Sequence, residues 1–245
     1  MKDSFSKQAI VYSKYRPVYP QVLFDCINSV VAHKKLAWDC GTGNGQTAKE
    51  LSKYFEQVYA TDISAKQIEN ASTADNITYA LEPAEQTSLK DNSVNLITVS
   101  QALHWFNFTA FYDEVKRVST PGAVIAVWAY SLLKITPVVD KIIEHYHFEI
   151  LKDYWDTERK YVDDGYANIP FPFTQINHPS FEISVNWTLQ DLEGYLTTWS
   201  ALQNFITANN FNPVPALIEK IKAYWQPETS LPVVFPIHLK IGYVH

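Results

Sequence analysis

The 245-residue chain predicts a single α/β domain built around a doubly wound, mostly parallel sheet. Two observations carry this prediction. Short apolar runs alternate with segments of helical periodicity through the first 135 residues. The run over residues 36–39 also leads, through Cys40, into a turn with glycines at 41, 43 and 45. Such a turn lets a ligand lie against bare backbone, because glycine has no Cβ to obstruct it.

Five strands are expected in the first half, each justified by its own pattern. The run over residues 123–130 is continuously apolar, which is typical of a parallel strand buried on both faces. The turn residues Asn92 and Ser93 mark the start of another strand. The full set of expected strands is 36–39, 57–62, 77–81, 94–99 and 123–130.

Helices are expected between these strands. One covers residues 47–54, and one begins after Ser64, where Gln67 three residues later completes a capping box. Apolar residues from Phe108 to Val118 repeat at helical spacing, and Pro121-Gly122 breaks that helix. The carboxyl ends of the parallel strands then form the edge at which such folds bind ligands.

The second half is less regular. Thr136-Pro137 begins a helix whose apolar face carries Val139, Ile142, Ile143, Tyr146 and Ile150. Residues 163–180 are rich in proline and aromatic residues and suit a lid or a connection. A helix beginning at Thr188 carries an apolar stripe as far as Ile206, and residues 233–243 read as a final strand.

Composition excludes several classes of function. The formal net charge is −6 and the chain has three arginines, Arg16, Arg117 and Arg159, so nucleic acid is not an expected partner. Cys26 and Cys40 cannot form a structural metal site by themselves and suit free thiols of a reducing cytoplasm. No secretory signal or run of 18 apolar residues is present, so we expect a cytoplasmic protein without a membrane span.

The glycine turn does not fit the common nucleotide motifs. A dinucleotide fingerprint needs glycine at position 46, where the chain has Gln46, and a phosphate loop needs a lysine after Gly45. The remaining pattern is D-x-G-x-G-x-G, beginning at Asp39. We expect the free N–H groups of this turn, together with the helix that follows, to bind polar or anionic groups.

Two further segments suit a nucleoside. Asp62 ends the second strand, where a carboxylate can accept hydrogen bonds from both ribose hydroxyls; alternatively it is a helix cap or a solvated turn residue. After the third strand, the backbone of residues 84–86 and the Glu85 carboxylate could match an adenine edge, or form an ordinary acidic loop.

Residues 100–106 follow the fourth strand and leave several alternatives open. His104 could be a general base, a hydrogen-bonding wall of the site, or a buried histidine satisfied by backbone. Trp105 could pack on a ligand, shape a substrate pocket, or belong to the core. Arg16, in an aromatic segment that includes Tyr12, suits a carboxylate but could also be a surface arginine stacked on tyrosines.

Taken together, these segments resemble class I S-adenosylmethionine-dependent methyltransferases, and within them a small-molecule branch that includes trans-aconitate methyltransferase-like proteins. The resemblance covers nearly the whole chain. Besides the glycine turn, the matching stretches are residues 15–20, 60–64, 83–85, 101–106, 117–122, 187–192 and 241–243.

This resemblance implies a seven-stranded Rossmann-like sheet with its last strand antiparallel, and a helical cap from the C-terminal half. Residues 1–135 would form the cofactor-binding core. Residues 136–232 would be mainly cap and substrate elements, with one strand near 170–183, and residues 233–243 the final strand.

The resemblance also implies a set of site residues. It places Asp39 and the glycine turn at the methionine end of S-adenosylmethionine, Asp62 at its ribose, Ala84 and Glu85 at its adenine, and residues 101–105 beside its methyl group. The expected cofactor-binding residues are Tyr12, Arg16, Asp39, Gly41, Thr42, Gly43, Gly45, Asp62, Ile63, Ala84, Glu85, Ser100 and Gln101. His104 and Trp105 are the catalytic candidates, and no metal is expected.

The implied reaction is methyl transfer to a small-molecule acceptor by in-line displacement. A protein that binds the cofactor or S-adenosylhomocysteine without turnover is the alternative, and a nicotinamide-dependent enzyme is a more distant one. Aromatic residues of the second half could line the acceptor site or be core: Trp155, Tyr161, Phe171, Phe173 and Trp199. The acceptor, the atom methylated and the oligomeric state stay open.

Overall fold

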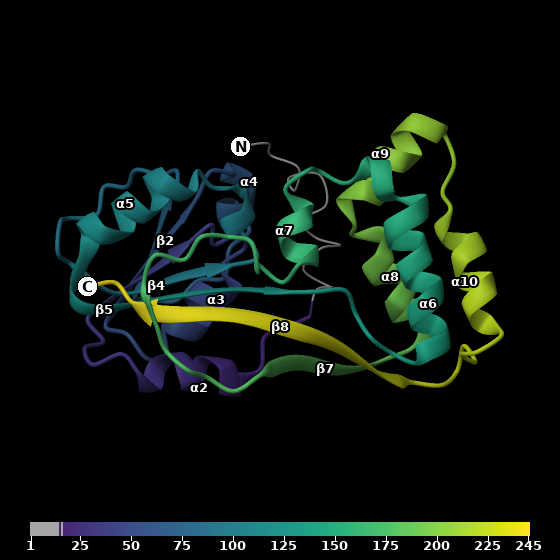
Figure 1. The fold of residues 1–245 in the computed structure, drawn as a ribbon, viewed down its shortest axis with the longest axis horizontal. Coiled ribbons are helices and arrows are strands. Elements are labelled where there is room, and N and C mark those ends of the chain that lie inside the picture. Colours follow the sequence, from purple (N-terminus) through teal and green to yellow (C-terminus); the bar gives the residue numbers. More distant parts are fainter. Residues whose placement is uncertain (1–14, 16) are drawn as a thin grey trace.

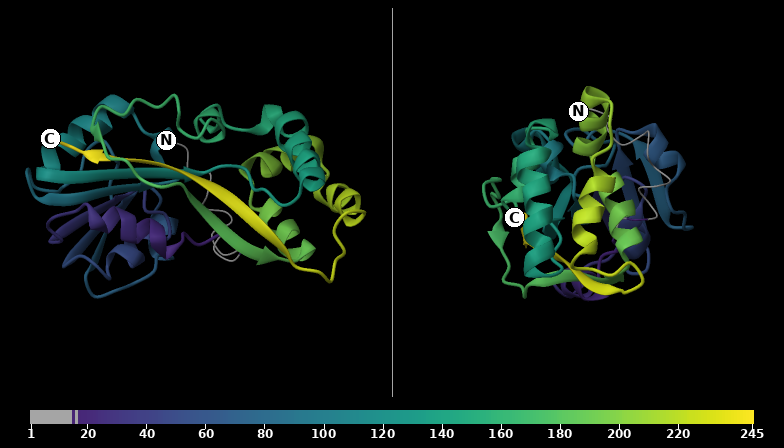
Figure 2. Two further views of the ribbon diagram at one scale, coloured as in Figure 1. Left: turned by 60° about the horizontal axis from the view of Figure 1, so that its bottom comes forward. Right: turned by 90° about the vertical axis from the view of Figure 1, so that its right-hand side faces the viewer.

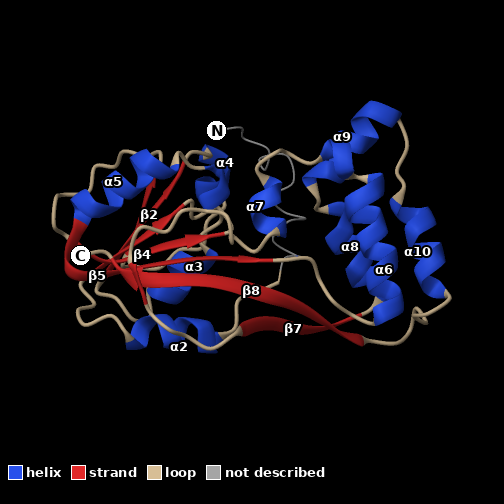
Figure 3. Ribbon diagram, viewed as in Figure 1, coloured by secondary structure: helices blue, strands red, loops and turns tan. Residues whose placement is uncertain are grey.

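A mixed sheet forms the centre of the protein, as Figure 3 shows. The structure, a computed structural model, describes residues 15 and 17–245. Five strands pair in parallel in the order β3-β2-β1-β4-β5, and β8 pairs antiparallel with β5. Their bounds are β1 Leu36–Cys40, β2 Gln57–Asp62, β3 Ile77–Leu81, β4 Val94–Ser100, β5 Ser119–Tyr130 and β8 Leu231–Tyr243. This confirms the doubly wound fold and the antiparallel final strand.

The outer edge of the sheet differs from the prediction, because the sheet has eight strands rather than seven. Two strands, β6 (Thr174–Gln175) and β7 (Phe181–Trp187), both pair with β8, at opposite ends of it. Pro179 lies in the interval between them and has no N–H to donate to a strand ladder. His178 spans this interval instead, with Nε2 3.0 Å from the Leu239 carbonyl oxygen.

Helices cover both faces of the sheet. On one face, α2 (Gln21–Ser29) and α3 (Gln46–Leu51) contribute Phe24 and Leu51 to a buried cluster that includes Trp128. On the other, α5 (Phe108–Val118) contributes Phe111 to a second buried cluster. Residues 123–130 of β5 are all buried, and alternate between the two clusters. The prediction that this strand is buried on both faces is therefore confirmed.

The second half adds a group of helices at one end of the sheet (Figures 1 and 2). The helices α6, α8, α9 and α10 pack side by side where the long β7–β8 ribbon ends, and α7 lies between them and the sheet. Their bounds are α6 Pro137–His145, α7 Arg159–Asp163, α8 Leu189–Thr197, α9 Ser200–Asn209 and α10 Val214–Lys222. In the part of the chain that the structure describes, no helix is both long and apolar enough to cross a membrane.

Several helix boundaries differ from the predicted ones. Helix α3 ends at Leu51 rather than Tyr54, and the apolar stripe from Leu192 to Ile206 is divided between α8 and α9. Ile150 is 40% exposed instead of lying on the apolar face of α6, because residues Tyr146–Ile150 are π-helical and this changes the side-chain periodicity.

Two predicted helix starts are supported by side-chain caps. The Ser64 hydroxyl accepts a hydrogen bond from the Gln67 N–H at the start of α4 (Ala65–Glu69). The predicted capping box is only half formed there, because the Ser64 N–H donates to Asp62 Oδ1. Thr188 and Asp191 form a complete capping box at the start of α8.

Candidate active site

The candidate site lies at the carboxyl edge of the parallel strands, where four loops meet. The Thr42 N–H donates to the Thr61 carbonyl (2.9 Å), which joins the loop after β1 to the end of β2. A Cβ added to Gly41 would lie 2.7 Å from the Ala102 Cβ, so the loop after β4 packs directly on the glycine turn. The fold therefore brings together segments that are about 20 to 60 residues apart in the sequence.

The Asp39 side chain holds the glycine turn in place. Its side chain is buried, and its two carboxylate oxygens accept hydrogen bonds from the Thr42 hydroxyl (2.5 Å) and the Thr98 hydroxyl (2.8 Å). Burial raises the pKa of Asp39 from 3.8 to about 6, although these hydrogen bonds oppose the shift. The carboxylate thus holds the turn against β4.

The three glycines of the turn all have left-handed backbone conformations, with φ of +66° at Gly41, +57° at Gly43 and +76° at Gly45. A Cβ on Gly45 would collide with the Tyr79 hydroxyl, whereas a Cβ on Gly43 would have no atom of the described residues within 4 Å. The backbone at Gly43 is therefore the part of the turn that faces open space, where a ligand can approach it.

The amides of the turn are used differently from the prediction. We expected them to be free for a ligand, but the Gly43 N–H donates to Asp62 Oδ2 (2.8 Å) and the Gly45 N–H to the Thr42 carbonyl (3.0 Å). With the Thr42 N–H also paired, three amides of the turn are satisfied internally. The expectation is wrong for these three groups, because the turn folds back on itself and on the loop after β2.

Asp62 connects the glycine turn to the loop after β2. Besides accepting from Gly43, it accepts the Ser64 N–H on Oδ1 (2.9 Å). A carboxylate has about four acceptor positions, and these two bonds use one position on each oxygen. Its neighbour Ile63 is 36% exposed and offers apolar surface at the same edge. The turn-residue role of Asp62 is observed, and it is compatible with binding hydroxyl groups.

The loop after β3 is tied to the start of α5. Glu85 Oε1 accepts the N–H of Asn107, the N-cap residue of that helix (2.9 Å), and Ala84 is buried. Glu82 accepts from the Tyr59 hydroxyl (3.0 Å) and from the Ser88 N–H (3.1 Å). Two carboxylates therefore fix the first part of this loop.

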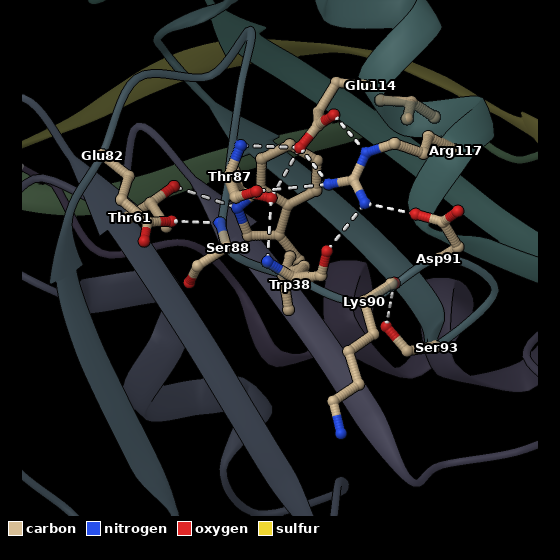
Figure 4. Close-up of polar contacts among 12 residues, drawn as sticks. Trp38, Thr61, Glu82, Thr87, Ser88, Lys90, Asp91, Ser93, Glu114 and Arg117 are labelled. Carbon is tan, nitrogen blue, oxygen red and sulfur yellow. Dashed lines mark hydrogen bonds and ion pairs between the residues drawn. The ribbon is translucent and has the colours of Figure 1, made fainter.

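A polar cluster around Glu114 and Arg117 anchors the rest of this loop (Figure 4). Glu114 accepts from the N–H and hydroxyl of Thr87 (both 2.7 Å), and Arg117 donates to Glu114, to Asp91 and to the carbonyls of Thr87 and Leu89. Sequence reasoning missed this anchor. The spacing of three residues between Glu114 and Arg117 was the only local signal.

The loop after β4 begins with a strained residue. Gln101 has φ of +55°, which is uncommon for a residue with a side chain. Its amide oxygen accepts the Tyr130 N–H (3.0 Å), and Ser100 donates to the Tyr19 hydroxyl (2.8 Å). Both predicted side chains therefore lie at this edge, and both contact the protein itself.

His104 is buried beneath α7 and the loop that follows it. Its Nδ1 lies 2.9 Å from the hydroxyl of the fully buried Tyr166. Burial, assisted by the nearby Arg159 charge, lowers the pKa of His104 from 6.5 to about 3, so the ring is neutral near pH 7. Such a weak base is poorly matched to proton abstraction near neutrality. The geometry favours a hydrogen-bonding wall, with the half-buried Trp105 ring beside it at 4.9 Å between centroids.

The remaining predicted residues are either not described by the structure or are aromatic residues of the second half. Tyr12 and Arg16 are outside the described residues. Of the aromatic candidates, Phe173 and Trp199 are buried core residues, whereas Tyr161 is half-buried and packs on Phe108. Among residues 15 and 17–245, no group of three or more histidine, cysteine, aspartate or glutamate side chains is arranged to hold a metal ion.

Comparisons with known proteins agree with this geometry. Residues 38–127 match the profile of a methyltransferase domain. A Dictyostelium discoideum protein assigned as a methyltransferase is 37% identical over 245 residues, which cover 97% of this chain and 93% of the relative. A Saccharomyces cerevisiae protein assigned as S-adenosylmethionine-dependent is 25% identical over 170 residues, covering 64% of this chain and 56% of its own.

A solved structure shows the same fold over nearly the whole chain. It is a protein from Anaeromyxobacter dehalogenans assigned as a type II methyltransferase, with a TM-score of 0.87 and 36% sequence identity. The match covers 94% of this chain and 98% of that one.

The pKa of Asp39 predicts an unusual pH dependence of stability. The pKa of the Asp39 carboxyl is about 6 in the native protein and 3.8 in the unfolded chain. The contribution of this group to stability is therefore fully present below pH 3.8 and is lost as the pH rises through 6. Between pH 5 and pH 7 we expect the free energy of unfolding of wild type to fall by about 1 kcal/mol relative to that of Asp39→Asn, as measured by urea unfolding. The exposed Asp153→Asn variant is the control; an Asp39→Asn variant with the wild-type pH dependence would contradict the assignment.

The burial of His104 predicts that its imidazole does not titrate between pH 5 and pH 8. The low native pKa also means that stability is lost as the pH falls from 6.5 toward 3, because the unfolded imidazole takes up a proton that the native one rejects. Nuclear magnetic resonance of the histidine ring signals, assigned with His104→Gln, measures this directly. A titration midpoint near 6.5 would restore His104 as a general base.

Proposed function

The chain belongs to the class I S-adenosylmethionine-dependent methyltransferases, and we propose that it methylates a small molecule bound where the carboxyl edge of the sheet faces the helices of the second half. Membership in this family decides against a nicotinamide-dependent enzyme. The observation that carries the proposal is the junction of the glycine turn, Asp62 and the loop after β4 at one edge.

The residues at this edge suit the cofactor. The backbone at Gly43 admits a ligand, the Asp62 carboxylate at the end of β2 would bind the ribose hydroxyls, and the loop carrying Ala84 and Glu85 is anchored where an adenine ring would extend. We assign Asp39 a positioning role, since its oxygens are occupied by Thr42 and Thr98. The cofactor supplies a methyl group on a sulfonium, which is itself a good leaving group.

The protein contributes mainly orientation and exclusion of water. Holding an acceptor in line with the methyl group can lower the barrier by about 7–11 kcal/mol. Neutral His104, fixed by Tyr166, would form part of the wall beside the acceptor. An acceptor that is already ionised would need no base at this position.

Two features support a small-molecule acceptor. The carboxyl ends of β4 and β5 point toward α7, and the remaining helices lie beyond it, so the second half stands over the edge where an acceptor would bind (Figure 3). The chain has 20 lysines and arginines against 26 acidic residues, which does not favour a nucleic-acid acceptor.

Asp62→Ala tests the cofactor assignment. We expect the affinity for S-adenosylhomocysteine to fall by about 10- to 100-fold, because each lost hydrogen bond to a charged group is worth about 1.5–3 kcal/mol. Isothermal calorimetry measures the change, with exposed Asp75→Ala as the matched control. Equal affinity in both variants would mean that Asp62 does not bind the ribose.

A labelling experiment tests the acceptor class. Purified protein is incubated with methyl-labelled S-adenosylmethionine and a cell extract that has been divided by ultrafiltration. We expect label in the small-molecule filtrate and none in the protein or nucleic-acid fraction. Label confined to the macromolecular fraction would overturn the proposed acceptor class.

A further inference from the structure

Arg159 lies on α7 with its side chain held in a fixed position. Its Nε donates to Asp163 Oδ1 (3.0 Å) one turn later, and its guanidinium lies 4.7 Å from the centre of the Trp155 ring. The side chain is 23% exposed. The same carboxylate oxygen of Asp163 lies 3.2 Å from His147 Nε2, so the carboxylate that orients Arg159 is itself held from a second helical segment.

The guanidinium of Arg159 forms fewer hydrogen bonds than that of Arg117. Arg117 engages Nε and both terminal nitrogens with Glu114, Asp91 and two backbone carbonyls. Within the described part of the chain, Arg159 hydrogen-bonds only through Nε. Its two terminal nitrogens form the flat end of the guanidinium, which can donate two parallel hydrogen bonds to one oxyanion.

The position of Arg159 connects it to the candidate site. Helix α7 packs against the 3-10 turn Leu103–Trp105, which contains His104. Burial is the main cause of the low pKa of His104, and the Arg159 charge adds to it. Figure 1 shows α7 between the sheet and the remaining helices, on the side toward which the strands point.

We propose that the terminal nitrogens of Arg159 bind one oxyanion, a carboxylate or a phosphate, carried by the methyl acceptor. This inference rests on the proposed function and specifies its substrate class. Asp163 and Trp155 fix the plane of the guanidinium before the ligand arrives, which reduces the entropy lost on binding. A single half-engaged guanidinium serves one anionic group, and the Trp155 ring against it suits an apolar part of the acceptor.

The chain offers a direct probe of this site because it contains only three arginines. Protein labelled with ¹⁵N-arginine and saturated with S-adenosylhomocysteine would be titrated with sodium acetate or inorganic phosphate, against sodium chloride at equal ionic strength. We expect saturable shifts of the Arg159 side-chain signals, assigned with Arg159→Gln, and none of Arg117. Acetate and phosphate in parallel show which oxyanion is preferred. Arg159 signals that move no more than those of Arg117 would overturn the proposal.

A second measurement links the site to turnover. For a compound labelled in the acceptor screen, we expect Arg159→Gln to lower kcat/KM at least 10-fold when the compound is anionic. With the wild-type enzyme, replacing the anionic group of the compound by an amide should lower kcat/KM by a similar factor. Lys160→Gln removes the same charge from the adjacent exposed residue and should change kcat/KM little. Equal turnover of the anionic and amide forms would contradict the inference. The affinity for S-adenosylhomocysteine is measured in wild type and in each variant. A wild type that does not bind it would contradict the proposed function, and this result is distinct from a failure of the Arg159 inference.

Discussion

The buried carboxylate of Asp39 is the constraint on which the rest of the site depends. It lies under the glycine turn and joins that turn, through Thr42, to β4, through Thr98. Burying a carboxylate opposes its ionisation, and the two hydroxyl donors compensate only in part. In this arrangement no atom of the described residues lies within 4 Å of a Cβ added to Gly43, beside the end of β2. The motif therefore acts largely through support of the turn, and its aspartate does not need to touch a ligand.

The turn and its neighbours are organised before any ligand binds. Asp62 accepts amides from both the glycine turn and its own loop, and Glu85 fixes the next loop to α5. Glu114 and Arg117 anchor the remainder of that loop. Because these contacts satisfy the polar groups internally, the edge of the sheet can hold a defined shape around a cofactor rather than acquiring it on binding.

Residues of the second half determine the environment of His104. Tyr166 and Arg159, both on or near α7, determine the environment of His104 by hydrogen bonding and charge, and burial keeps that ring neutral. A neutral, fixed histidine in the loop after β4 and a partly engaged arginine on α7 therefore lie on two elements that pack against each other. This combination suits recognition and orientation of an acceptor better than acid–base catalysis by His104.

The sequence by itself determined the parallel sheet, most strand bounds, the glycine turn and the capped starts of α4 and α8, because each depends on residues that are close together in the chain. It also placed Asp39, Asp62, Glu85 and His104 at one edge, since the carboxyl ends of parallel strands must coincide. Only the tertiary structure decided that the turn's amides are satisfied internally, that the outer strand is interrupted, and that His104 is neutral. His104 and Tyr166 are 62 residues apart. Burial, charge and pairing over such separations follow from how the elements pack, which local sequence patterns do not encode.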